Sequence, residues 1–127
     1  MRTTFTTHEG VRICVLDFSN VNSEAEALLA IADAKAIIGR EPQASVYTLT
    51  DVSGSQVTSA IRTALHELTK ANKPYVVAGA VVGVTALQGV ILRGIVQVTR
   101  RRLVAKNTRA EAMAWLANEA KLDSSKR

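Results

Sequence analysis

One short segment stands out for the chemistry that its side chains could do. It runs from Thr48 to Gln56 and reads Thr-Leu-Thr-Asp-Val-Ser-Gly-Ser-Gln. The segment lies where a predicted strand ends and a predicted helix begins, and open α/β sheets bind ligands beyond the carboxyl ends of their strands. Helix N-termini also offer free N–H groups and a positive dipole end to anions. The candidate regulatory or binding residues in this segment are Asp51, Ser53, Gly54 and Ser55.

The same segment has a purely structural interpretation. Ser53 and Gln56 have the spacing of a capping box, in which each side chain satisfies a free backbone N–H at the start of a helix. Asp51 with Gly54 is typical of an ordinary turn. If Ser53 caps the helix, its replacement by alanine should cost about 1 kcal/mol. The residues alone leave capping and binding both open.

Other reactive side chains do not assemble into a catalytic set. A nucleophilic site needs a nucleophile, a base and an orienting group. His8 falls in a polar terminal segment and His66 on the outer side of a predicted helix, and neither has an evident partner. Cys14 has apolar neighbours, which indicates a buried structural thiol. No cluster has metal-ligand spacing. We therefore expect a protein that is not an enzyme and that carries no cofactor or metal.

The charge of the chain is unevenly placed. The formal net charge is +5, but residues 1–90 hold 7 Lys and Arg against 8 Asp and Glu, whereas residues 91–127 hold 9 against 3. Such asymmetry is typical of a solvated face, or of contact with nucleic acid, anionic lipid or an acidic protein. The basic residues that would form an anion-binding patch are Arg93, Arg100, Arg101, Arg102, Lys106 and Arg109.

The hydrophobic pattern divides the chain into alternating strands and helices. Strands are expected over residues 3–7, 11–18, 45–50, 75–84 and 103–105. Helices are expected to begin at Ser23, near Ser53, near Thr85 and at Thr108. Their buried stripes are expected to be Ala27, Ile31, Ala34 and Ile38 in the first helix; Val57, Ile61, Leu65 and Leu68 in the second; Leu87, Ile91, Ile95 and Val98 in the third; and Ala112, Met113, Leu116 and Ala120 in the fourth.

This order of elements predicts one α/β domain over residues 1–127. Parallel strands need crossover connections, so the pattern indicates a mixed, mainly parallel sheet of about five strands with about four helices. Residues 119–127 are expected to be a frayed polar tail. The terminus from Met1 to His8 lacks the apolar core of a secretory signal, which favours a cytoplasmic location.

A membrane span is the rival interpretation of residues 75–92. This stretch is uncharged over 18 residues and is followed by Arg93 and by the arginines at 100–102. However, Thr85 and Gln88 divide it into a valine-rich strand and an amphipathic helix, which fits the alternation upstream. We therefore expect that the protein does not span a membrane.

Several short runs together resemble a known family. They are Val15-Leu16-Asp17-Phe18-Ser19, Leu49-Thr50-Asp51-Val52-Ser53-Gly54, Asn72-Lys73-Pro74-Tyr75-Val76, Ala80-Val81-Val82-Gly83-Val84-Thr85 and Asn107-Thr108-Arg109-Ala110-Glu111-Ala112 with Trp115-Leu116. In order and spacing they resemble the STAS domains, and within them the SpoIIAA-like family, over residues 10–118. The resemblance implies a regulatory domain without catalytic activity, related to the anti-sigma-factor antagonists and more loosely to CRAL-TRIO lipid-transfer domains.

The resemblance also implies a role for one serine. In the antagonists a partner kinase phosphorylates the serine that precedes the glycine of an Asp-Ser-Ser-Gly motif, and Ser53 before Gly54 matches that position. This chain departs from the motif, because Val52 stands where the antagonists have the first serine.

Three functions follow as hypotheses. The first is a regulatory module that binds another protein through the Asp51–Ser55 loop. The second is a carrier of a small apolar or amphipathic ligand, for which an apolar pocket with a few polar groups would be needed. The third is weak binding of an anionic surface by the basic C-terminal third, without specific nucleic-acid recognition. A homodimer is also an open alternative.

Overall fold

The computed structural model describes residues 2–83 and 102–125. Its strands are β1 (Thr3–His8), β2 (Val11–Asp17), β3 (Val46–Asp51), β4 (Val76–Val82) and β5 (Arg102–Lys106). Its helices are α1 (Glu24–Ile38), α2 (Ser59–Asn72) and α4 (Arg109–Ser125). The helix expected from Thr85 onward falls outside the described residues, so three of the four expected helices are described.

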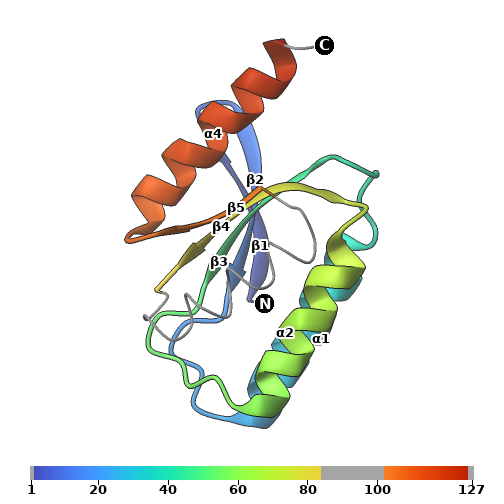
Figure 1. Cartoon of the computed structure of the whole chain (residues 1–127), viewed down its shortest axis with the longest axis vertical. Helices are drawn as coiled ribbons and strands as arrows, with labels where there is room; N and C mark the ends of the chain where they lie inside the picture. The colour runs from blue at the N-terminus through green and yellow to red at the C-terminus, as the bar shows by residue number, and fades with distance from the viewer. Residues whose placement is uncertain (1, 84–101, 126–127) are drawn as a thin grey trace.

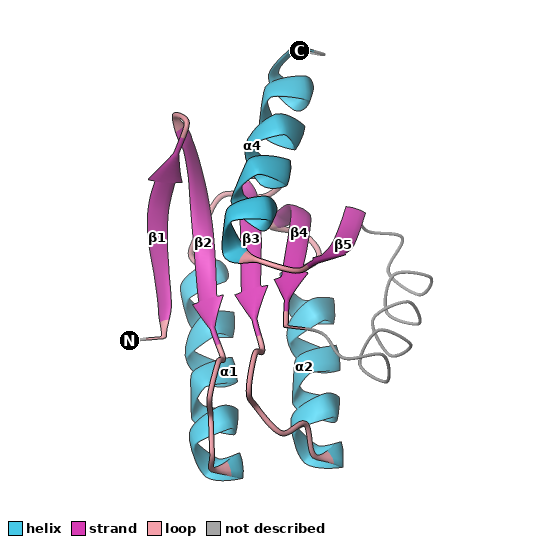
Figure 2. Cartoon of the chain, turned by 90° about the vertical axis from the view of Figure 1, so that its left-hand side faces the viewer, coloured by secondary structure: helices cyan, strands magenta, loops and turns pink. Residues whose placement is uncertain are grey.

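The strands form a single sheet in the order β1-β2-β3-β4-β5 (Figure 2). β1 and β2 are an antiparallel hairpin, and the turn Glu9-Gly10 between them has positive φ at both residues. The pairs β2–β3, β3–β4 and β4–β5 are all parallel. The predicted mixed, mainly parallel sheet of five strands is therefore confirmed. Its parallel register places Asp17, the last residue of β2, beside Asp51, the last residue of β3.

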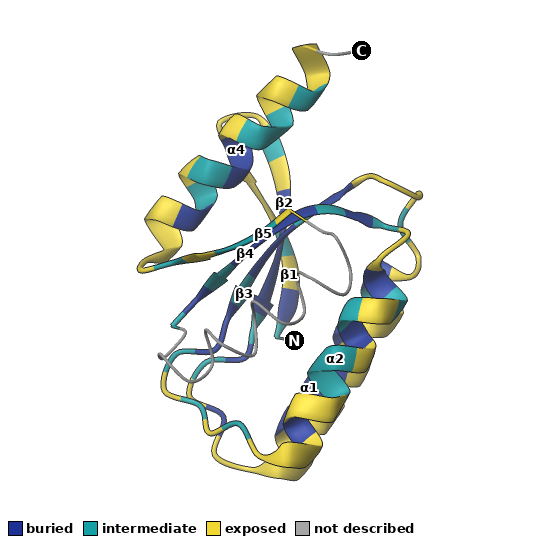
Figure 3. Cartoon of the chain, in the orientation of Figure 1, coloured by how far each residue is buried: buried dark blue, intermediate teal, exposed yellow. Residues whose placement is uncertain are grey.

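Helices cover the two faces of the sheet in separate layers. α1 and α2 lie side by side on one face, and α4 crosses the other (Figures 1 and 2). Each face has its own apolar cluster: Cys14 and Leu16 belong to the cluster under α1 and α2, whereas Ile13, Val15 and Leu49 belong to the cluster under α4. Figure 3 shows the buried residues concentrated in the strands and on the inner sides of the helices. Alternate residues of β2 therefore supply both cores.

The first helix forms as its sequence predicts. Ser23 is the N-cap, and its hydroxyl accepts a hydrogen bond from the Glu26 N–H at 3.3 Å. Gly39 follows the last turn, and its own N–H donates to the Lys35 carbonyl. The predicted inward stripe is buried in full: Ala27, Ile31, Ala34 and Ile38.

The second helix begins later than the sequence analysis places it. The N-cap is Thr58, whose hydroxyl accepts from the Ile61 N–H at 3.2 Å, so the predicted capping role of Ser53 is wrong. Gly54 has φ +71°, and a left-handed residue cannot belong to an α-helix. Residues up to Thr58 therefore remain a loop. Of the predicted inward stripe, Ile61 and Leu68 are buried, Leu65 is half-buried, and Val57 precedes the helix.

The last helix starts at the expected residue and continues beyond the expected end. Thr108 accepts a hydrogen bond from the Glu111 N–H at 3.1 Å, as the capping-box spacing predicts. The inward residues are Ala112, Leu116 and Ala117, whereas Met113 and Ala120 are only half-buried.

Residues 119–125 are helical, so the tail expected to fray from residue 119 is ordered as far as Ser125. Arg102 of β5 contacts this part of the helix: it pairs with Glu119 at 2.5 Å and with Asp123 at 2.7 Å. Tyr47 of β3 also donates to Asp123 at 2.5 Å. Two strands therefore hold the C-terminal turns of α4 against the sheet.

Candidate functional site

The candidate loop begins with a turn made by Asp51. The Asp51 side chain is 9% exposed, and its Oδ1 accepts a hydrogen bond from the Ser53 N–H at 2.9 Å. An aspartate that binds the N–H two residues ahead closes a tight turn. The Val52 N–H donates to the Val82 carbonyl at the end of β4. The start of the loop is thus fixed both by its own side chain and by the neighbouring strand.

The loop after β2 contains the same kind of aspartate turn. Asp17 ends β2 as Asp51 ends β3, and its Oδ1 accepts from the Ser19 N–H at 3.1 Å and from the Ser19 hydroxyl at 2.5 Å. The sequences Asp17-Phe18-Ser19 and Asp51-Val52-Ser53 share this Asp-X-Ser spacing. Two similar turns therefore lie side by side at the carboxyl edge of the sheet.

Arg109 joins the two turns. It is the first residue of α4, and its Nε donates to Asp51 Oδ2 at 2.7 Å. Its Nη2 lies 3.1 Å from Asp17 Oδ1, which makes a second ion pair. The Arg109 side chain is 44% exposed, so the guanidinium lies at the rim of the edge, above the buried Asp51 carboxylate. Three elements, β2, β3 and α4, thus meet in one network of charged groups.

The surroundings keep both carboxylates ionised. Burial raises the pKa of Asp51, but hydrogen bonds from Ser53 and Arg109 outweigh that effect and lower the pKa below its usual value. Burial also raises the pKa of Asp17, and the hydrogen bonds from Ser19 with the charges of Arg109 and Arg2 again lower it overall. The hydrogen bond to Asp51 is in turn the largest cause of a raised pKa of Arg109. The network is therefore charged at neutral pH.

Backbone and hydroxyl groups bind the two loops directly to each other. Phe18 N–H donates to the Asp51 carbonyl and Asn20 N–H to the Ser53 carbonyl, each at 2.8 Å. The Ser55 hydroxyl donates to the Phe18 carbonyl at 2.5 Å and accepts from the Val21 N–H at 2.8 Å. Ser55 was expected inside the first helical turn, and it instead acts as a connector between the loops.

The candidate residues differ in how much of them faces outward. Gly54 is exposed, Ser53 and Ser55 are half-buried, and Asp51 is buried. Gly83, at the end of β4, allows the close approach of the loop: it has φ +84°, and a Cβ atom there would lie 2.6 Å from the Ser53 backbone. Ser53 is thus held in a crowded position, and Gly54 beside it is exposed.

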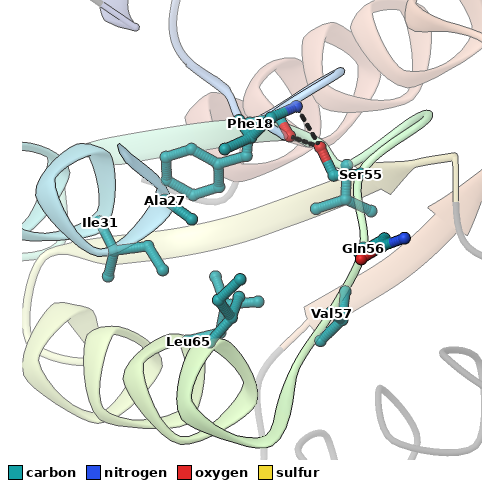
Figure 4. A pocket seen from close by; sticks show the side chains of 10 residues that line it. Phe18, Ala27, Ile31, Ser55, Gln56, Val57 and Leu65 are labelled. Atoms are coloured by element: carbon teal, nitrogen blue, oxygen red, sulfur yellow. Dashed lines mark hydrogen bonds between the residues drawn. The ribbon is translucent and has the colours of Figure 1, made fainter. Parts of the chain in front are cut away.

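A small apolar hollow opens beside this loop, between α1 and α2 (Figure 4). Phe18, Ile31 and Leu65 are among its lining residues, and the Ser55–Phe18 hydrogen bond closes one side. Its cavity volume is about 20 Å³. Pockets for drug-sized ligands measure roughly 300–1,000 Å³. The hollow has space for about one water molecule and none for a lipid.

Of the three basic patch residues that the structure describes, two have acidic partners. Arg109 pairs with Asp17 and Asp51, and Arg102 pairs with Glu119 and Asp123. Lys106 is half-buried at the end of β5. The other three patch residues, Arg93, Arg100 and Arg101, lie outside the described residues. The described part of the patch therefore holds α4 in place more than it offers free positive charge.

The Cys14 thiol lies in the core of the protein. Cys14 is 1% exposed, and burial, with a smaller effect of Glu41, raises the pKa of its thiol to about 12. A thiol that stays protonated is a poor nucleophile. Within residues 2–83 and 102–125, no three His, Cys, Asp or Glu side chains are grouped as metal ligands would be. In those same ranges, no helix is both long and apolar enough to cross a membrane.

Comparison with known proteins identifies the fold. A solved structure of an anti-sigma-factor antagonist (STAS) domain protein from Planctomyces limnophilus superposes on this chain with a TM-score of 0.61. The match covers 91% of this chain and 97% of the other, at 18% sequence identity. No protein-family model matches the sequence, and no curated protein is significantly similar to it. The chain thus has the fold of a STAS domain, as its sequence motifs predict.

Sequence reasoning missed two residues of this edge. Asp17 was noted only as part of a family motif, and Arg109 only as part of a family motif and of the basic patch. The shared Asp-X-Ser spacing at the ends of two successive predicted strands was the available signal for Asp17. For Arg109 there was none, because its pairing joins residues 58 positions apart and depends on the crossing of α4 over the sheet.

Proposed function

We propose that the chain is a regulatory module, without enzymatic activity, that binds another protein through the Asp51–Ser55 loop. The observation that carries the proposal is the construction of the loop, which is held by side-chain and backbone hydrogen bonds while Gly54 and Gln56 remain exposed. A surface that is already ordered loses little conformational entropy on binding. The STAS fold supports the same role, since the P. limnophilus protein that shares it is named as an anti-sigma-factor antagonist domain.

The alternatives have weaker support. A carrier needs a cavity for its ligand, and within residues 2–83 and 102–125 the hollow beside the loop is too small for an apolar molecule of lipid size. Weak anionic-surface binding needs free cations, and among the patch residues that the structure describes Arg102 and Arg109 are engaged with carboxylates. A regulatory role would suit a cytoplasmic protein, and the cytoplasmic location and the homodimer stay predictions.

Site-specific photo-crosslinking tests the proposal. A photoreactive amino acid replaces Gln56, which is exposed beside the loop, and in a control chain it replaces Ser124, which is exposed in the last turns of α4. We expect a crosslinked protein adduct from position 56 in the cells that make this chain, and none at the same size from position 124. Identical adducts from both positions, or none from position 56, would contradict the proposed surface.

A further inference from the structure

The two loops at the carboxyl edge are linked by an unbroken chain of polar contacts. Ser53 donates to one oxygen of Asp51, and Arg109 donates to the other. The same guanidinium contacts Asp17, which accepts from Ser19. The path therefore runs from the loop after β3, through the first residue of α4, to the loop after β2.

We propose that Arg109 is a positioning residue that joins the two loops into one binding surface and carries a change of charge at Ser53 to Asp17 and its turn. This inference rests on the proposed function, because it extends the Asp51–Ser55 surface to the Ser19–Asn20 turn. Arg109 acts through the two aspartates and touches no partner in this account.

The charges give the direction of the effect. Arg109 divides its N–H groups between two carboxylates that would otherwise repel each other across the paired ends of β2 and β3. A new negative charge at Ser53 would lie beside Asp51 and compete for the guanidinium. Arg109 then shifts toward the loop after β3 and gives up part of its contact with Asp17. Arg2 stays near Asp17, since it donates to the Asp17 and Ser19 carbonyls, so the turn is loosened and not released.

The geometry also explains why the coupling between the two loops needs an arginine at position 109. Its planar group can address two carboxylates at once through Nε and Nη2, whereas a lysine presents a single charged centre. We expect Arg109→Lys to keep one of the two contacts and to couple the loops only in part. Arg109→Gln should remove the coupling.

Carboxyl-carbon NMR titration of the isolated chain tests the inference. Ser53→Asp adds the charge, and Ser53→Asn is the matched control because it has nearly the same size and no charge. With Arg109 present, we expect the titration midpoint of Asp17 to be higher in Ser53→Asp than in Ser53→Asn, and the Ser19 amide to exchange faster with solvent. In the Arg109→Gln background the difference between the two Ser53 variants should largely disappear.

Two results would overturn the inference. One is an Asp17 midpoint that is the same in Ser53→Asp and Ser53→Asn. The other is a difference that persists in full with Arg109→Gln, because a direct field from position 53 would then be its cause. If Ser53→Asp does not fold, Asp51→Asn tests the same link with the opposite sign, since Arg109 is then free to bind Asp17 more closely and the Ser19 amide should exchange more slowly.

These measurements need no partner. If photo-crosslinking fails while the NMR titration shows the coupling, the proposed function is refuted and the role of Arg109 between the two loops stands. Successful crosslinking with no coupling would do the reverse.

Discussion

Single hydroxyl groups have distinct tasks at the carboxyl edge of this sheet. Thr58 caps α2, Ser55 connects the two loops, and Ser53 belongs to the Asp51 turn. The three residues lie within a stretch of six and carry the same hydroxyl group, so their roles differ only because their positions in the fold differ. The positions therefore predict different costs for the same alanine substitution.

Thr58→Ala should lower the free energy of unfolding by about 1 kcal/mol, because it removes the cap of α2. Ser53→Ala should cost less, since it leaves that cap and the Ser53 N–H bond to Asp51 in place. Urea denaturation of the two variants beside wild type measures both values. A larger loss for Ser53→Ala than for Thr58→Ala would contradict the assignment of the cap.

The Asp51 carboxylate should make stability depend on acid pH. Folding lowers its pKa, so the ionised group stabilises the fold above the unfolded-state pKa of about 3.9. This stabilisation is lost as the pH falls through the lower pKa of the folded state. Asp51→Asn should lower the free energy of unfolding by about 2 kcal/mol at neutral pH, which is the scale of a hydrogen bond to a charged group. On acidification the variant should lose less of its free energy of unfolding than wild type does. Parallel losses from pH 6 to pH 3 in both proteins would argue against this role for Asp51.

The three helix starts show what sequence patterns can and cannot predict at the scale of elements. Ser23 and Thr108 are found at N-caps as their capping-box spacing predicts. Ser53 has the same spacing with Gln56, yet Asp51 closes a turn there and Gly54 has a left-handed backbone conformation. The helix therefore begins only after Thr58. Thr58 has Ile61 three positions on, not Glu or Gln, and therefore lacks the signal.

Contacts between distant elements explain the other differences. The succession of strands and helices along the chain follows from hydrophobic patterns that are local in the sequence. The mainly parallel direction of the strands follows from the crossover connections between them. The ordered end of α4 depends instead on Arg102 and Tyr47, which lie in two other elements and meet Asp123 only after folding. The pairing of Arg109 with Asp17 and Asp51 has the same origin. The loop could thus be located from the sequence, but not the network that supports it.

Gly83 should be essential to the docking of β4 against the loop. Any side chain there meets the Ser53 backbone, and its φ of +84° is strained for an L-residue. Gly83→Ala should therefore cost about 2 kcal/mol or more, from left-handed strain and crowding together. Gly10→Ala is a useful control, because Gly10 also has positive φ but its Cβ would meet nothing within 4 Å. Thermal unfolding that shows equal losses for both variants would mean that crowding at Ser53 is unimportant.

At the scale of the whole molecule, the charge asymmetry should have little effect on binding. In the part of the patch that the structure describes, Arg102 and Arg109 are held by carboxylates. We therefore expect these two residues to add little to a weak, strongly salt-dependent binding of a polyanion such as heparin. Arg102→Gln should leave that binding unchanged within about twofold. Retention on heparin above physiological salt, lost in Arg102→Gln, would show that the patch binds anions after all.

The fold places one ordered edge where two loops and the start of α4 meet, and we assign partner binding to that edge. Calorimetric titration with the protein captured through position 56 tests this assignment most directly. We expect Ser53→Asn to bind nearly as wild type does, and Ser53→Asp to bind at least about tenfold more weakly, a loss of about 1.4 kcal/mol, while circular dichroism shows both folded. Equal affinity of the two folded variants would contradict the assignment and remove the Asp51–Ser55 loop from the interaction surface.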